Sequence, residues 1–118
     1  MLQMSCLNSC LVILKICYLN ERRSVVPSEY KLKLTEEIKK HTPSAKIYLY
    51  GSRATNTHRP TSDIDLAIDT GEKINKGIMD TINKGILELQ LSLEVEVVDM
   101  NNVTQGHIER IEREKILW

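Results

Sequence analysis

Residues 51–69 read GSRATNTHRPTSDIDLAID, and this stretch decides the fold. Its first part, residues 51–62, is polar and rich in turn-forming residues, whereas Thr61–Ile68 alternates between two kinds of side chain. Alternate residues of a strand point to opposite faces of a sheet. One face therefore carries Asp63, Asp65 and Ala67, and the other carries Ile64, Leu66 and Ile68. The pattern predicts a half-buried strand with carboxylates on one face.

The sequence on either side of this stretch predicts six further elements. Hydrophobic residues at four-residue steps indicate helices, and short β-rich runs indicate strands. The expected elements are a helix over Ser28–His41, a strand over Ala45–Tyr50, a helix over Glu72–Leu89, a strand over Leu91–Met100, a helix capped by Thr104 that ends at Glu114, and a terminal strand or tail at Ile116–Trp118. The fold class expected from this order is α/β (α+β), with a small mixed β-sheet and helices packed on it. Gly77 and Gly85 lie inside the third element, so we expect that helix to be irregular.

The length of 118 residues indicates one folded domain, which we place at residues 26–118. Pro27-Ser28 marks its start, because the residue before a proline avoids helix and serine is a good N-cap. The sequence has no Phe and one Trp, so its core must consist of Ile, Leu and Val. The formal net charge is zero, and no basic stretch predicts extended DNA or RNA binding.

Residues 1–25 differ in composition and form an N-terminal extension of uncertain status. Its apolar run, Cys10–Leu19, is about half the ~20 residues that span a bilayer. No basic residue precedes the run, which argues against a secretory signal, so we expect a cytoplasmic protein without a membrane segment. The three cysteines, Cys6, Cys10 and Cys17, fit reduced thiols better than a metal site, because no histidine or fourth cysteine stands at ligand spacing. Two interpretations stay open: an added helix that packs on the domain or a partner, or residues upstream of the true start codon.

Asp63 and Asp65 indicate a site that binds divalent cations. Two carboxylates on one strand face can converge on Mg²⁺, which is typically held by one or two carboxylates together with substrate phosphates. Gly51-Ser52 can bind those phosphates, because a glycine lets the backbone approach a ligand and consecutive N–H groups bind anions. Arg53, in the same loop, can neutralise phosphate charge, as can Arg59.

A third acidic ligand is expected from the strand at residues 91–100. Glu94 and Glu96 share one face of that strand, and Asp99 lies on the other. Glu96 is central in the strand and is our prediction for the third carboxylate, with Glu94 and Asp99 as alternatives. Isolated Asp-x-Asp pairs are usually solvated surface. Asp is depleted in strands, however, and like charges gathered on one face repel unless a cation neutralises them.

Gly51-Ser52, ten residues and then Asp63-x-Asp65 resemble the signature of the DNA polymerase β-like nucleotidyltransferase superfamily. The wider stretch is similar to its minimal nucleotidyltransferase (MNT) antitoxins, and the resemblance runs from about residue 29 to the C-terminus. It implies two Mg²⁺ ions held by Asp63, Asp65 and Glu96, which would be the catalytic residues. It also implies ATP as a substrate, bound by Gly51, Ser52, Arg53 and Ser62.

The same resemblance implies a protein partner. Minimal members are commonly encoded beside a HEPN-domain toxin, act as its antitoxin, and in some cases transfer AMP from ATP to a toxin tyrosine. We therefore expect a protein adenylyltransferase that forms a hetero-oligomer with such a toxin. The family often has Gly where this chain has Asn56, a residue that tolerates left-handed backbone. Its third carboxylate is often Asp, whereas position 96 is Glu.

Other functions stay open at this point. The chain can be a non-catalytic antitoxin that blocks its toxin by contact, although the intact Gly-Ser and Asp-x-Asp motifs argue against a decayed site. It can also be a nucleotidyltransferase acting on a small molecule or on RNA, but such enzymes usually carry extra domains that bind the acceptor. His58 and His107 are candidates for metal or acid–base roles, but isolated histidines in polar segments are more often solvated.

Overall fold

A four-stranded mixed sheet forms the centre of the protein in the computed structural model, which describes residues 26–118. The strands are β1 (Lys46–Tyr50), β2 (Ile64–Asp69), β3 (Val95–Asp99) and β4 (Ile116–Leu117), in the order β3-β2-β1-β4. β1 pairs antiparallel with both β2 and β4, whereas β2 and β3 are parallel. The crossover between the parallel strands contains a helix, as such a connection normally requires.

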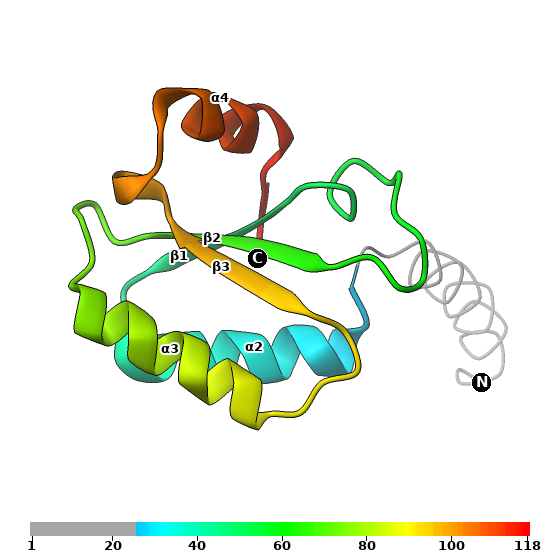
Figure 1. Ribbon diagram of the computed structural model, residues 1–118, viewed down its shortest axis with the longest axis horizontal. Helices are drawn as coiled ribbons and strands as arrows, with labels where there is room; N and C mark the ends of the chain where they lie inside the picture. The colour runs from blue at the N-terminus through cyan, green and yellow to red at the C-terminus, as the bar shows by residue number, and fades with distance from the viewer. Residues whose placement is uncertain (1–25) are drawn as a thin grey trace, which may run out of the picture.

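Helices cover both faces of this sheet (Figure 1). α2 (Ser28–His41) and α3 (Lys76–Glu88) pack on one face, and α4 (Gln105–Glu114) lies on the other, after the short 3₁₀ turn η1 (Met100–Asn102). The larger core fills the space beneath α2 and α3 and consists mainly of Ile and Leu, as the absence of Phe requires. The smaller core, under α4, is formed by Tyr50, Ala67, Met100 and Ile111. The mixed α+β architecture predicted from the sequence is therefore confirmed.

Several element boundaries differ from the predicted ones. β2 begins at Ile64 rather than Thr61, and β3 begins at Val95 rather than Leu91. The N-cap of α2 is Pro27, without a side-chain cap, so the prediction that Ser28 caps this helix is wrong. α3 begins at Lys76 because the side chain of Asn75 accepts the Gly77 N–H at 2.7 Å and caps the helix there.

The two glycines of α3 do not interrupt it, contrary to the expected irregularity. Gly77 lies in the first turn, where Asn75 caps its N–H. Gly85 faces α2, where a Cβ atom would collide with the side chain of Glu37. A close helix contact thus explains a residue that is unfavourable for helix in isolation.

None of the helices within residues 26–118 has the length and apolar character that spanning a bilayer requires. The predictions for Cys10–Leu19 and for the three cysteines concern residues outside those that the structure describes.

We expect a chain that begins at Val26 to keep the cooperative thermal unfolding of the full-length protein. The reason is that Val26 is 4% exposed and belongs to the main core, while the sequence changes character before it. A chain that begins at Ser28 is the matched control. It lacks the buried Val26 side chain and should be less stable by about 1–2 kcal/mol. Loss of the cooperative transition on removing residues 1–25 alone would show that the extension belongs to the core.

Candidate active site

The Gly51-Ser52 turn follows β1 directly and has the geometry of an anion-binding turn. The Gly51 carbonyl accepts the N–H groups of Ala54 and Thr55 at 3.0 and 3.1 Å, so the chain makes a single helical turn here. The leading N–H groups of such a turn have no partner within it and are suited to bind phosphate. Gly51 has φ +82°, a conformation that disfavours side chains, and Asn56 has φ +62°, which confirms that asparagine adopts the left-handed geometry expected there.

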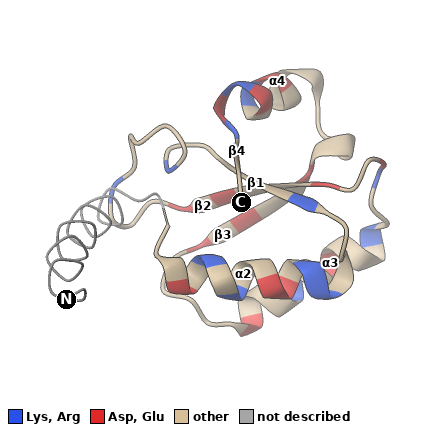
Figure 2. Cartoon of the chain, turned by 180° about the vertical axis from the view of Figure 1, so that it is seen from behind, with Lys and Arg blue, Asp and Glu red and all other residues tan. Residues whose placement is uncertain are grey.

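Asp65 and Glu96 are brought together by the pairing of β2 with β3. The two residues are direct partners in the parallel register, and Asp65 is also the partner of Tyr50 across β1. Burial, followed by the negative charge of Glu96, raises the pKa of the Asp65 carboxyl to about 6. The charge of Asp63 acts in the same direction. The three predicted carboxylates therefore influence one another, and Figure 2 shows acidic positions on both β2 and β3, which run side by side.

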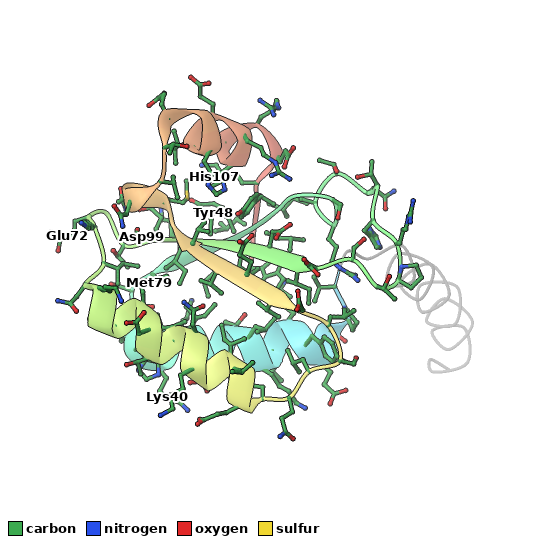
Figure 3. All side chains as sticks on the ribbon, viewed as in Figure 1. Lys40, Tyr48, Glu72, Met79, Asp99 and His107 are labelled. Carbon is green, nitrogen blue, oxygen red and sulfur yellow. The ribbon has the colours of Figure 1, made fainter. Side chains whose placement is uncertain are left out.

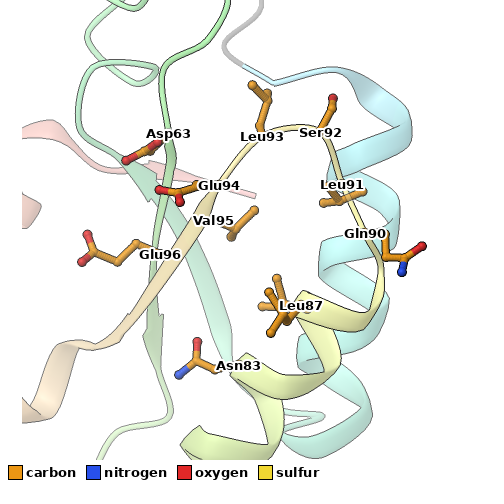
Figure 4. A pocket seen from close by; sticks show the side chains of 11 residues that line it. Asp63, Asn83, Leu87, Gln90, Leu91, Ser92, Leu93, Glu94, Val95 and Glu96 are labelled. Carbon is orange, nitrogen blue, oxygen red and sulfur yellow. The ribbon is translucent and has the colours of Figure 1, made fainter.

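Asp63 precedes β2 rather than lying in it, and it is exposed. It lines one pocket of about 620 Å³ with Glu94 and Glu96. Figure 4 shows these three carboxylates at one end of the pocket, near the starts of β2 and β3, with Leu87 and Leu91 at the other end toward α3. The pocket gives a substrate group room beside the acidic residues.

The structure separates the three candidates for the third carboxylate. Glu96 is in β3 opposite Asp65, whereas Glu94 lies just before β3 begins. Asp99 is 5% exposed, and its two oxygens accept the N–H groups of Ile74 and Asn101 at 2.7 and 2.9 Å. Its carboxylate thus holds the chain before α3 and the start of η1 in place. Register favours Glu96, and its metal-binding role stays a prediction.

Arg53 lies inside the loop between β1 and β2. The residue is 4% exposed, and its guanidinium donates to the carbonyls of Ser62, Arg59 and Pro60 at 3.1–3.4 Å. The Ser62 hydroxyl accepts the Arg59 N–H at 2.8 Å. Arg53 and Ser62 therefore shape the loop that delivers Asp63 to the site. Their predicted contact with nucleotide stays a prediction.

α4 contributes two residues to this site that the sequence alone did not indicate, Arg110 and Glu114, and it also carries His107, a candidate from the sequence. Glu114 accepts the Gly51 N–H at 3.0 Å and pairs with Arg110, whose Nε lies 3.3 Å from the same oxygen. The Arg110 guanidinium sits over the Tyr50 ring, 5.6 Å from its centroid. His107 lies on the sheet-facing side of α4 (Figure 3), with its Nε2 3.1 Å from the Tyr50 hydroxyl. The i, i+4 spacing of Arg110 and Glu114 was the available sequence signal, but it is common on exposed helices.

The donor set of the site fits Mg²⁺, because it consists of carboxylate oxygens, the ligands that this cation prefers. Burial, and after it the charges of Glu96 and Asp63, raise the pKa of Asp65, so a cation would stabilise its ionised form. Within residues 26–118, no three His, Cys, Asp or Glu side chains are placed to hold a single metal ion together. Mg²⁺ requires fewer: one or two carboxylates suffice when substrate phosphates and water supply the remaining oxygens.

We expect Gly51→Ala to reduce both stability and ATP binding, because a Cβ at this position would collide with the carboxylate of Asp65. The positive φ alone costs about 1 kcal/mol. Gly71→Ala is the matched control: Gly71 has φ +90°, yet nothing lies within 4 Å of an added Cβ. Thermal unfolding should show a loss in both variants and a larger loss at Gly51. ATP titration should show weaker binding for Gly51→Ala alone, and equal ATP binding by the two variants would contradict the close approach of Asp65.

Comparison with known proteins places this geometry in a family. The family model described as "Polymerase beta, Nucleotidyltransferase" matches residues 32–118. No curated protein sequence matches the chain. Among solved structures, a toxin–antitoxin complex with AMP-PNP matches with TM-score 0.61 and 22% identity, over 73% of this chain and 70% of the other.

Two further solved structures share the fold. One is a structure of a tri-AMPylated Shewanella oneidensis HEPN toxin in complex with MNT antitoxin. A chain of that complex matches with TM-score 0.60 and 16% identity, over 77% of this chain and 71% of the other. A protein of Sulfolobus solfataricus described as a nucleotidyltransferase matches with TM-score 0.52 and 22% identity, over 85% and 83%. The family model covers the turn, both strands that carry the carboxylates, and α4. The chain therefore belongs to the polymerase beta nucleotidyltransferase family.

Proposed function

We propose that this protein is the antitoxin of a HEPN-type toxin and transfers AMP from ATP to a hydroxyl group of that toxin. The observation that carries the proposal is the pairing of Asp65 with Glu96 across β2 and β3, beside the Gly51-Ser52 turn. This arrangement puts carboxylates for a divalent cation next to N–H groups suited to phosphates. Solved structures of the same fold include a toxin–antitoxin complex with AMP-PNP and an AMPylated HEPN toxin in complex with an MNT antitoxin.

Asp63, Asp65 and Glu96 would hold two Mg²⁺ ions together with the phosphates of ATP. The ions would supply charge neutralisation for the attacking and leaving oxygens of an in-line displacement. Gly51 and Ser52 would hold the triphosphate against this acidic face. The raised pKa of Asp65 supports the proposal, since it reflects negative charges gathered at a partly buried position where a cation would be favoured.

In the proposed reaction, the acceptor hydroxyl oxygen bonds to the α-phosphorus of ATP. The bond from that phosphorus to the oxygen bridging to the β-phosphate breaks, and pyrophosphate leaves. The hydroxyl proton leaves to solvent, a loss that Glu96 favours, and the Gly51-Ser52 turn orients the phosphates. In this reaction the residues form no covalent intermediate. They contribute by positioning the acceptor and ATP and by stabilising the charge that develops in the transition state.

A macromolecular acceptor fits the size and shape of the site. Asp63 and Glu96 are exposed, and the pocket beside them is open to solvent toward the exposed side chain of Leu87. A folded protein that presents a hydroxyl can reach such a surface, whereas a small molecule would find few enclosing walls. A complex with the toxin in the cytoplasm, where ATP is abundant, is the expected setting.

Mass spectrometry of the toxin tests this proposal. The toxin encoded beside this chain is incubated with the protein, ATP and Mg²⁺, and its mass should increase by AMP. Omission of Mg²⁺ or replacement of ATP by AMP should leave the mass unchanged. A toxin that is neutralised without gaining mass would contradict transfer and favour inhibition by contact.

A further inference from the structure

The acidic face of the sheet, which carries Asp65 and Glu96, lies near a cationic side chain that is linked by its contacts both to the Gly51-Ser52 turn and to Asp65. This is Arg110 of α4, which pairs through Nε with Glu114, the residue that accepts the Gly51 N–H. Its guanidinium also lies over Tyr50, the direct β1 partner of Asp65. Two independent contacts thus place this charge beside the position where the carboxylates and the turn meet.

The Arg110 guanidinium keeps donor capacity for a ligand. An arginine side chain has five N–H donors, and the contact with Glu114 is made through Nε. The Arg110 side chain is 48% exposed, so solvent and a ligand can reach it. Arg53, by contrast, is buried and donates to loop carbonyls. Arg110 thus has the exposure and position needed to meet an anion at the acidic face.

We infer that Arg110 binds the triphosphate of the nucleotide, with Glu114 as the residue that positions it. Guanidinium groups recognise phosphate oxygens through two parallel hydrogen bonds, and those bonds are stronger than neutral ones. The same charge would stabilise pyrophosphate as it leaves. This inference rests on the proposed function, because it names a further contact of the same nucleotide.

Arg110→Gln tests the inference, with Arg113→Gln as its matched control. Arg113 is an exposed arginine of the same helix, so both variants remove one positive charge from α4. We expect Arg110→Gln to weaken ATP·Mg²⁺ binding about tenfold or more and to weaken AMP binding much less. Arg113→Gln should bind both nucleotides as the unmodified chain does. Arg110→Lys should recover part of the ATP affinity, since lysine restores the positive charge but lacks the planar guanidinium that makes two parallel hydrogen bonds.

Thermal unfolding separates a nucleotide contact from a structural role. The Arg110 side chain is 48% exposed, and ion pairs with an exposed partner contribute little to stability, so Arg110→Gln should unfold within a few degrees of the unmodified protein. Equal ATP affinity in Arg110→Gln and Arg113→Gln would overturn the inference and leave the proposed function intact. Equal losses of ATP and AMP binding would also overturn it. Failure of the unmodified chain to bind ATP in the presence of Mg²⁺ would overturn the proposed function itself, and this inference with it.

Discussion

Replacing Asp63 and Asp65 together by asparagine should abolish Mg²⁺-dependent ATP binding, with a loss of about 100-fold or more in affinity. Asparagine keeps the size of the side chain and removes the negative charge that a divalent cation requires. Asp65 is the central acidic residue, because it is paired with Glu96 in the sheet and its pKa is raised to about 6. Calorimetric titration of ATP with and without Mg²⁺ measures the effect directly.

A charge-matched control distinguishes metal binding from general electrostatics. Glu72 and Asp80 are exposed acidic residues away from the sheet edge that carries the site. The double variant Glu72→Gln/Asp80→Asn changes the net charge by the same amount as Asp63→Asn/Asp65→Asn, and it should bind ATP as the unmodified protein does. Equal metal-dependent binding by the aspartate variant and this control would refute the assignment of the site.

Glu96→Gln should abolish AMP transfer to the toxin and leave the toxin–antitoxin complex nearly intact. The variant keeps the shape of the side chain but removes the charge opposite Asp65 and the group proposed to favour loss of the acceptor proton. Removing one electrostatic stabiliser of a transition state typically costs 10²–10³-fold in rate, so transfer of labelled AMP should fall by about that factor. Size-exclusion chromatography of the mixture should still show the complex.

Glu94→Gln is the matched control for that experiment. Glu94 lines the same pocket but precedes β3, so it lacks a partner position opposite Asp65. We expect this variant to keep most of the transfer rate. A larger loss in Glu94→Gln than in Glu96→Gln would assign the third carboxylate to Glu94. A toxin that Glu96→Gln neutralises as well as the unmodified protein does, without any gain in mass, would identify the protein as a binding inhibitor.

Where the sequence predicted elements well, local physical chemistry was sufficient. The bounds of α2 agree with the predicted ones, because Leu34 and Ile38 recur at helical spacing and Thr42-Pro43 ends the pattern. Thr104 caps α4 as predicted, with its hydroxyl accepting the His107 N–H. The starts of β2 and β3 were predicted too early, because alternation continues into Thr61–Asp63 and Leu91–Glu94, whereas the pairing of the two strands begins at Ile64 and Val95.

The sequence by itself determined the α+β architecture and the candidate carboxylates, because periodicity and the spacing of Gly51-Ser52 and Asp63-x-Asp65 are local properties of the chain. Only the tertiary structure decided which acidic residue faces Asp65, since the register of parallel strands joined by α3 cannot be read from either strand alone. It likewise decided that Arg53 turns into the loop while Arg110 and Glu114 reach the turn from α4. The physical reason is that residues 63 positions apart, such as Gly51 and Glu114, meet only when α4 packs on the sheet and the chain returns as β4 beside β1.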